Sequence, residues 1–200
     1  MEVVHAMNVQ AVTLEGTHVR LEPLSLDHCA VLQDVALDSD LWRWTLNDVR
    51  TLEELRAYVA TAIRERDEGH SLPFAILECG TGRGIGSTRF GNIEPVHRRV
   101  EIGWTWVGRP WQRSAVNTEC KYLLLGHAFE TLRCVRVELK TNALNQRSRT
   151  AILRIGATEE GTFRRHAVNA HGVWRDTVFY SILDHEWPVV KKRLESVLGR

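Results

Sequence analysis

The sequence predicts an α/β fold of the α+β type: a mixed, twisted and largely antiparallel sheet of about six or seven strands, with helices on both faces. Strand-like and helix-like segments follow one another in the order ββ-αα-βββ-α-β-α-ββ-α. Short turns join most neighbouring strands and make them antiparallel, whereas a single strand–helix–strand unit makes one parallel pair. The 200 residues, of which 44% are apolar, suffice for one core.

The boundaries follow from turn and cap signals. We expect a loose tail over residues 1–11 and one domain over residues 12–200. Thr51 and Glu54 have the spacing of a capping box, which predicts the start of a helix. The first half is expected to hold two short strands within 12–24, a helix from Ser25 to about Leu37, a loop over 38–47, a helix that ends at Gly69, and a hairpin of strands 72–79 and 85–93.

The second half is organised around residues 100–131, which read as a buried strand, a polar loop and a helix. Gly108, Arg109 and Pro110 end the strand, and Asn117 or Thr118 can cap the helix. The remaining expected elements are a strand over 134–140, a polar loop over 142–147, a short helix over 148–155, a hairpin of strands 158–168 and 173–183, and a last helix that opens at Asp184.

The loop between that strand and helix is a candidate anion site. Free backbone N–H groups at a helix start, beside positive charge from Arg109 and Arg113, are a common setting for a phosphate. An ordinary connection with solvated arginines explains the same residues, and the loop alone does not separate the two interpretations.

Composition narrows the class of protein. No run of apolar residues is long enough for a membrane span, and the N-terminus lacks the pattern of a signal peptide. The four cysteines are widely spaced, so we expect buried thiols in a cytoplasmic protein, with neither disulfides nor a metal site. A pI of about 7.8 argues against a dedicated nucleic-acid binder. We therefore expect neither nucleic-acid nor membrane partners, whereas a homodimer is possible through an exposed strand edge.

Several short strings, in order, resemble the GNAT superfamily of acyl-CoA-dependent N-acetyltransferases, and within it the RimJ/RimL type that modifies ribosomal proteins. The resemblance covers about residues 12–186. The strings are Glu101-Ile102-Gly103, Thr118-Glu119, Asn145-Gln146-Arg147-Ser148, Gly156-Ala157 with Glu160-Gly161, and Arg175-Asp176 with Tyr180-Ser181-Ile182-Leu183.

The resemblance implies acetyl-CoA as co-substrate. Its pyrophosphate would lie on the N–H groups of residues 112–118, and its pantetheine arm between two splayed parallel strands, which a bulge in the central strand separates. The implied cofactor-binding residues are Trp104, Thr105, Trp106, Val107, Gln112, Arg113, Ser114, Ala115, Val116, Asn117, Thr118, Asn142, Asn145 and Arg147. One departure stands out: Ala115 and Asn117 occupy positions where the family's pyrophosphate signature carries glycine or alanine.

Acetyl transfer to an amine requires loss of the amine's proton and stabilisation of the leaving thiolate. Ser148 matches the serine that follows the loop asparagine in relatives, and it is the candidate for the thiolate, although it could simply cap a helix. Glu101 is the candidate base because burial in an apolar strand favours the protonated form of a carboxyl group. The alternatives for Glu101 are a cross-strand arginine partner, or a water chain that makes a dedicated base unnecessary.

The acceptor is expected to be a primary amine, either on a small molecule or at a protein N-terminus. In relatives the region that contains Trp42 and Trp44 forms a substrate wall, and aromatic faces suit a cationic amine; both could instead be core anchors. Two other functions compete with this one. The altered glycine positions would fit a non-catalytic acyl-CoA-binding module, and the basic second half would fit a nucleic-acid-binding domain.

Overall fold

The computed structural model describes residues 7–200. Most of the predicted tail, residues 1–6, lies outside the described residues, and Met7 is buried, with its sulfur 3.5 Å from Sγ of Cys134. The domain boundary at residue 12 remains a prediction. The strands are β1 (Leu14–Glu15), β2 (Val19–Pro23), β3 (Leu72–Glu78), β4 (Gly84–Glu94), β5 (Arg99–Val107), β6 (Arg136–Asn142), β7 (Thr158–Val168) and β8 (Trp174–Leu183). The helices are α1 (His28–Ala36), α2 (Leu52–Asp67), α3 (Ala115–Gly126), α4 (Gln146–Arg154) and α5 (Trp187–Leu198).

All eight strands form one sheet in the order β1-β2-β3-β4-β5-β6-β8-β7. Every neighbouring pair is antiparallel except β5 and β6, which α3 connects. The predicted fold class and the single crossover are therefore confirmed. The sheet has eight strands, more than the predicted six or seven, because every strand in the expected order of elements, including the two-residue β1, joins this one sheet.

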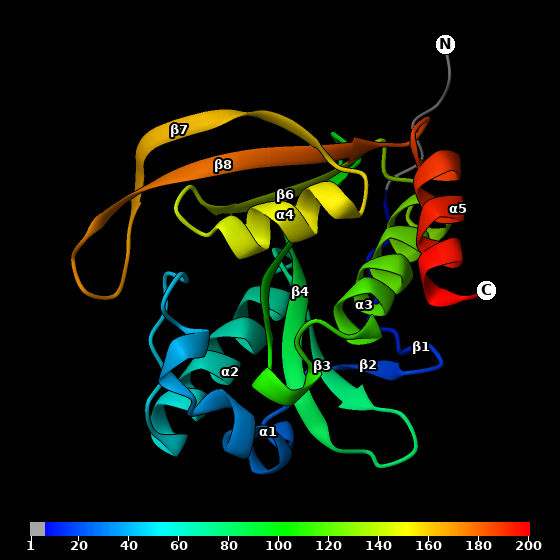
Figure 1. Cartoon of the computed structure of the whole chain (residues 1–200). Coiled ribbons are helices and arrows are strands. Elements are labelled where there is room, and N and C mark those ends of the chain that lie inside the picture. The colour runs from blue at the N-terminus through cyan, green and yellow to red at the C-terminus, as the bar shows by residue number, and fades with distance from the viewer. Residues whose placement is uncertain (1–6) are drawn as a thin grey trace.

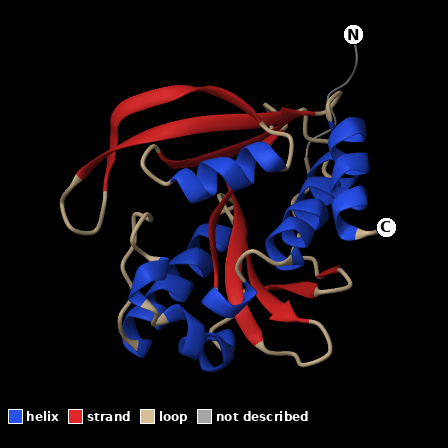
Figure 2. Cartoon of the chain, in the orientation of Figure 1, coloured by secondary structure: helices blue, strands red, loops and turns tan. Residues whose placement is uncertain are grey.

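Helices cover both faces of the sheet (Figures 1 and 2). On one face, α1 and α2 pack on a cluster that includes Ala75, Leu77 and Trp106. On the other face, α3 and α5 lie side by side over a larger cluster that includes Val100, Val137 and Ile182. Strands β6, β8 and β7 form, with α4, a separate arm of the molecule in Figure 1.

Helix starts follow the side chains that cap them. The predicted capping box of α2 is confirmed: Thr51 Oγ1 accepts from the Glu54 N–H, and Glu54 Oε2 accepts from the Thr51 N–H. The predicted start of α3 at Asn117 or Thr118 is wrong, because Ser114 is the N-cap, and its Oγ accepts a hydrogen bond from the Val116 N–H.

Strand β5 contains a bulge at the point where it leaves β6. Ser87 of β4 faces Trp106 and Arg89 faces Gly103, so β5 carries one residue more than β4 between these pairs. Trp104 lies in this bulge with a left-handed φ of 49°. The parallel ladder between β5 and β6 ends just before it, at the pair Glu101–Glu138. The predicted bulge and splay are therefore confirmed.

The carboxylate of Glu119 fixes α3 to the first hairpin. Glu119 is fully buried, and it accepts backbone hydrogen bonds from Thr17 at 2.9 Å, His18 at 2.6 Å and Val19 at 2.8 Å. Arg200 pairs with the same carboxylate. Gly16 lies so close that a Cβ there would be 2.5 Å from Glu119 Cδ. The turn between β1 and β2 is therefore built around this side chain.

Substitution Glu119→Ala should lower the free energy of unfolding by about 3–5 kcal/mol, because it leaves buried N–H groups and a cation without their partner. Urea unfolding followed by circular dichroism measures the loss. Arg200→Ala, which removes only the partly exposed cation, should cost less. Equal midpoints for the parent and Glu119→Ala would contradict this assignment.

Candidate functional site

A cleft of about 740 Å³ opens where β5 and β6 part. Its walls come mainly from four places: the loop after α1, the second half of β5, the loop that leads into α3 with the first turns of that helix, and the end of β6 with α4. Tyr58 of α2 and Arg175 of β8 add to them. The predicted strand–loop–helix unit therefore contributes two of the four walls, and the arm formed by β6 and α4 closes the cleft from the other side.

The cleft is strongly cationic. Among the residues that the structure describes, those that line it include six cationic side chains and no aspartate, glutamate, histidine or cysteine. The cations are Arg113, Lys121, Lys140, Arg147, Arg154 and Arg175. Lys140 pairs with Glu101, but within residues 7–200 the other five cations form no ion pair. Because unpaired cations favour an anionic ligand, the electrostatics fit a molecule that carries phosphate groups.

The start of α3 adds backbone donors to these cations. Ser114 Oγ occupies the Val116 N–H, so other first-turn N–H groups remain for a ligand. Arg113 is the loop residue with a left-handed φ, 61°, whereas Ala115 and Asn117 are helical. The missing glycines are therefore compatible with the loop, because neither position requires a left-handed backbone.

Gln112 joins the two sides of the cleft. Its amide nitrogen donates to the Val107 carbonyl at 2.8 Å, and its amide oxygen accepts from Arg147 Nη1 at 2.7 Å. Since Arg147 belongs to α4, this bridge connects the loop before α3 to the opposite arm.

Most predicted cofactor-binding residues line the cleft: Trp104, Thr105, Trp106, Val107, Gln112, Arg113, Ser114, Asn117, Asn145 and Arg147. Four others, Ala115, Val116, Thr118 and Asn142, are not among the lining residues. Thr118 is buried and accepts from Arg154 Nη2, and Asn142 Oδ1 accepts from the Leu144 N–H, so both have structural partners. Arg109 was expected to add charge at the loop, but it pairs with Asp38 and Asp40 and does not line the cleft.

Ser148 lies on the cleft wall, in the first turn of α4. Asn145 is the N-cap of this helix, and its Oδ1 accepts from the Ser148 N–H at 3.1 Å. The alternative in which Ser148 caps the helix is therefore wrong. Within residues 7–200 no side-chain hydrogen bond occupies the Ser148 hydroxyl, which leaves it available to a ligand.

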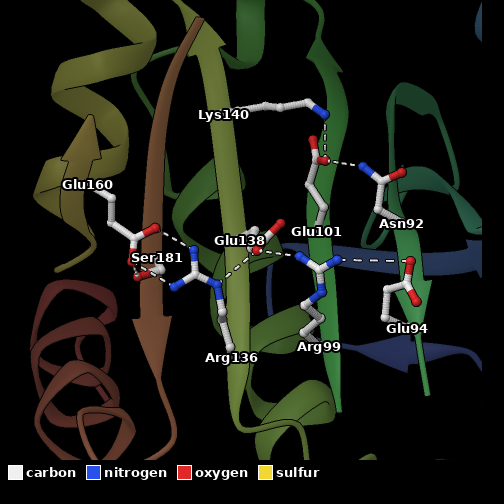
Figure 3. A network of polar contacts seen from close by, with 9 residues as sticks. All are labelled: Asn92, Glu94, Arg99, Glu101, Arg136, Glu138, Lys140, Glu160 and Ser181. Atoms are coloured by element: carbon white, nitrogen blue, oxygen red, sulfur yellow. Dashed lines mark hydrogen bonds and ion pairs between the residues drawn. The ribbon is translucent and has the colours of Figure 1, made fainter. Parts of the chain in front are cut away.

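Glu101 lies behind the cleft wall and not on it. Its Oε2 is 2.8 Å from Lys140 Nζ on β6 and accepts from Asn92 Nδ2 on β4 at 2.6 Å (Figure 3). The alternative of a cross-strand cation is the one the structure favours, with lysine in place of the expected arginine. The carboxylate lies close to Gly103, which does line the cleft, since a Cβ at that position would be 2.8 Å from Oε1.

A separate series of ion pairs lies beside Glu101 across the neighbouring strands (Figure 3). Arg99 on β5 binds Glu138 on β6 at 3.0 Å, and Arg136 pairs with both Glu138 and Glu160. The Arg136 guanidinium lowers the pKa of the Glu160 carboxyl through their hydrogen bond. These contacts hold β5, β6 and β7 together at the end of the sheet where the parallel ladder is intact.

Trp42 and Trp44 both line the cleft but differ in burial. Trp42 is buried, donates to the Ala36 carbonyl at 2.7 Å and packs edge-on against Tyr58, so it is also a core anchor. Trp44 is half-buried, and its carbonyl accepts from Arg175 Nη1 at 3.0 Å. The contact with Arg175 ties the loop after α1 to strand β8.

Sequence reasoning did not single out Lys121, Lys140, Arg154 or Arg175 as cleft residues. Lys140 alternates with buried residues on β6, which does place it on one face of the sheet, whereas Arg175 lies at the solvent-accessible start of β8 and has no such pattern. Lys121 gave no such signal, because a lysine in a helix is normally exposed, whereas here it is buried.

The matched family is described as "Acetyltransferase (GNAT) domain", and the match covers residues 18–158. The chain belongs to this family. The predictions of a GNAT fold and of an acyltransferase are thereby confirmed. No helix in the described part of the chain is long and apolar enough to cross a membrane.

Relatives with solved structures match almost the whole chain. A "putative acetyltransferase" from T. thermophilus is 38% identical, with a TM-score of 0.87, over 96% of this chain and all of that one. RimJ from Mycobacterium smegmatis, solved with CoA-disulfide, shares the fold with a TM-score of 0.78 over 95% of this chain and 94% of that one, at 24% identity.

A curated relative points to the same branch. The "Putative ribosomal N-acetyltransferase YdaF" of Bacillus subtilis is 34% identical over 96 residues. The alignment covers 48% of this chain and about half, 51%, of that protein. The resemblance to the RimJ/RimL type is therefore confirmed as a resemblance.

Substitution Arg147→Ala should weaken CoA binding by about tenfold, because it removes a phosphate-competent cation and the bridge to Gln112. Isothermal titration calorimetry with CoA measures the change. Arg109→Ala is the matched control: Arg109 precedes α3 but pairs with aspartates away from the cleft, so affinity should stay within about twofold. Equal weakening by both substitutions would mean that the cleft does not hold the phosphates.

Proposed function

We propose that the chain transfers an acetyl group from acetyl-CoA to a primary amine, by direct attack of the amine on the thioester. The cationic cleft at the parting of β5 and β6 carries this proposal. It offers backbone groups of a bulged strand beside the start of a helix, and its charge suits a phosphate-bearing donor. The donor supplies the activated acyl group.

The chain's own residues would divide the binding work along the cleft. The start of α3, with Arg113 and Arg147, would hold the phosphates. The bulged run from Trp104 to Val107 would hold the pantetheine arm, because bulges leave ladder groups unpaired. The Ser148 hydroxyl would donate a hydrogen bond to the sulfur as negative charge develops there. Fixing donor and acceptor in one geometry would contribute a large part of the rate.

Proton removal from the amine would not use a side chain on the described cleft wall, since no carboxylate or histidine lies there. Glu101, the predicted candidate base, lies next to Gly103 of the cleft wall. Its paired carboxylate would receive the proton only through water that reaches past this glycine. We therefore propose Glu101 as the end of a water path and not as a group in contact with the amine.

The acceptor would enter beside Trp42 and Trp44, whose ring faces suit a cationic amine. By analogy with the ribosomal relatives, we propose a protein N-terminus, such as that of a ribosomal protein, ahead of a small-molecule amine. A cytoplasmic location, a single domain and a homodimer through an exposed strand edge also stand as proposals. The feature that favoured a non-catalytic module, the altered glycine positions, no longer does so, because both are helical.

An amine panel tests the proposal directly. Thiol release from acetyl-CoA is measured with tetrapeptides that begin with glycine, alanine or serine, and with free amino acids, polyamines and aminoglycosides. We expect turnover with at least one amine and a mass gain of one acetyl group on that product. Tight CoA binding without turnover on any amine would overturn the proposal and support a binding module.

Ser148→Ala should lower turnover by about tenfold to a hundredfold while changing the affinity for acetyl-CoA less than about threefold, because the hydrogen bond to sulfur strengthens only as the thiolate forms. Steady-state kinetics and calorimetry separate the two effects. Thr150→Ala removes another cleft-lining hydroxyl from the same helix and should leave both quantities near the parent's. Parent-like turnover of Ser148→Ala would remove Ser148 from the mechanism.

A further inference from the structure

Lys121 is a buried cation at the bulge of β5. It lies on α3, is 6% exposed, and lines the cleft. Its Nζ donates to Thr105 Oγ1 at 3.0 Å. Thr105 belongs to the bulged run, and its hydroxyl is also 2.8 Å from Thr88 Oγ1 on β4. Lys121 therefore reaches from the helix to the point where β5 leaves β6.

The ammonium group of Lys121 is under-satisfied within residues 7–200. An ammonium carries three donors, and the Thr105 hydroxyl takes one of them. No described carboxylate lies within 4.0 Å of its nitrogen, and none lines the cleft. A buried, unpaired cation costs stability. An apolar side chain would fill this place at a lower cost, so packing does not explain the lysine.

The cleft offers a use for this cation. Under the proposed function the pantetheine arm of the donor lies along residues 104–107, and Lys121 is hydrogen-bonded to Thr105 in this segment. The reaction develops negative charge on one donor atom in particular, the sulfur of the leaving thiolate. In a site of low dielectric constant, a positioned ammonium stabilises such charge far better than it does in water.

We propose that Lys121 is a catalytic residue that protonates the leaving thiolate, a role that rests on the proposed function. As the acceptor nitrogen bonds to the acyl carbon, the carbon–sulfur bond breaks and its electron pair stays on sulfur. A proton moves from Lys121 Nζ to sulfur and yields the free thiol of CoA. The neutral lysine regains a proton from solvent, and the proton that the acceptor amine loses leaves by the water path that ends at Glu101. Ser148 would hydrogen-bond the same sulfur from α4.

The acidity of the ammonium fits this task. Burial lowers the pKa of Lys121 to about 8, so at neutral pH the group is mostly protonated yet able to give up its proton. Its neighbour Cys120 stays neutral, because burial raises its thiol pKa to about 12. The other charged side chains that line the cleft from α4, β6 and β8 are Arg147, Arg154, Lys140 and Arg175, and Thr88 and Thr105 do not titrate. Glu119 of α3 faces Arg200 instead.

The sign of the pH dependence follows. The protonated form is required, so the rate should fall as the pH rises through about 8. The experiment measures thiol release from acetyl-CoA against pH, both with the best amine of the panel and without any amine, as hydrolysis. The amine-free reaction removes the acceptor's own titration from the profile.

Lys121→Met should lower the rate by about tenfold to a hundredfold at pH 7, abolish the fall above about pH 8, and change the affinity for acetyl-CoA less than about threefold. Lys121→Arg keeps a cation but cannot release its proton in this pH range. This variant should bind the donor normally, release thiol as slowly as Lys121→Met, and show no fall in rate above about pH 8. Thr105→Val is the matched control. It removes the hydroxyl that orients the Lys121 ammonium but keeps Lys121 itself, so the fall in rate above about pH 8 should persist.

Circular dichroism of each variant separates misfolding from lost chemistry; Lys121→Met should be at least as stable as the parent, because it removes a buried charge. A parent-like rate and a parent-like limb in both Lys121 variants would overturn the role of Lys121 and leave the proposed function standing. Absence of thiol release from the parent with every amine would overturn the proposed function and this role together.

Discussion

The structure depends on how short the parallel ladder between β5 and β6 is. These strands pair over three residues, from Arg99–Arg136 to Glu101–Glu138, and then separate at the bulge that holds Trp104. Had the ladder continued, backbone hydrogen bonds would fill the space that is now the cleft. The ion pairs of Arg99 and Arg136 with Glu138 hold the paired end closed while the other end opens.

Charge is sorted about this opening. Carboxylates near the parted strands, such as Glu101 and Glu138, are paired behind the wall, whereas the wall itself carries cations. The arrangement suits a phosphate-bearing donor, and the described part of the wall holds no carboxylate or histidine that could act as a direct base. It also leaves Lys121 as a buried cation whose one partner within residues 7–200 is a neutral hydroxyl, and this cost to stability underlies its proposed catalytic role.

The elements themselves were readable from the sequence because local rules decide them. Apolar spacing and the Thr51–Glu54 capping box predicted the helices, and strand composition with turns predicted the antiparallel hairpins. The start of α3 was misplaced because three nearby candidates can cap a helix, and only the fold selects Ser114. Whether Ala115 and Asn117 suit their positions depended on backbone angles that the sequence does not reveal.

The site was readable only where the family resemblance supplied the geometry. That resemblance predicted the bulge, and Ser148 and most of the residues that it assigned to cofactor binding do line the cleft. The sequence does not show which side chains pair with one another. Glu101 was predicted to be a base, but the structure places Lys140 beside it. Arg109 was predicted to add charge for a phosphate, but the structure pairs it with Asp38. Lys121 was missed because helix position alone does not show that a lysine is buried against another element's hydroxyl.

The central claim is that the opening between β5 and β6 is the donor site. The most direct test is a crystal structure of the chain with CoA bound. We expect the phosphates at the first turn of α3 and the pantetheine arm along residues 104–107, with its thiol near Ser148 and Lys121. CoA bound on another surface, or β5 and β6 paired beyond Glu101–Glu138 with CoA present, would contradict it.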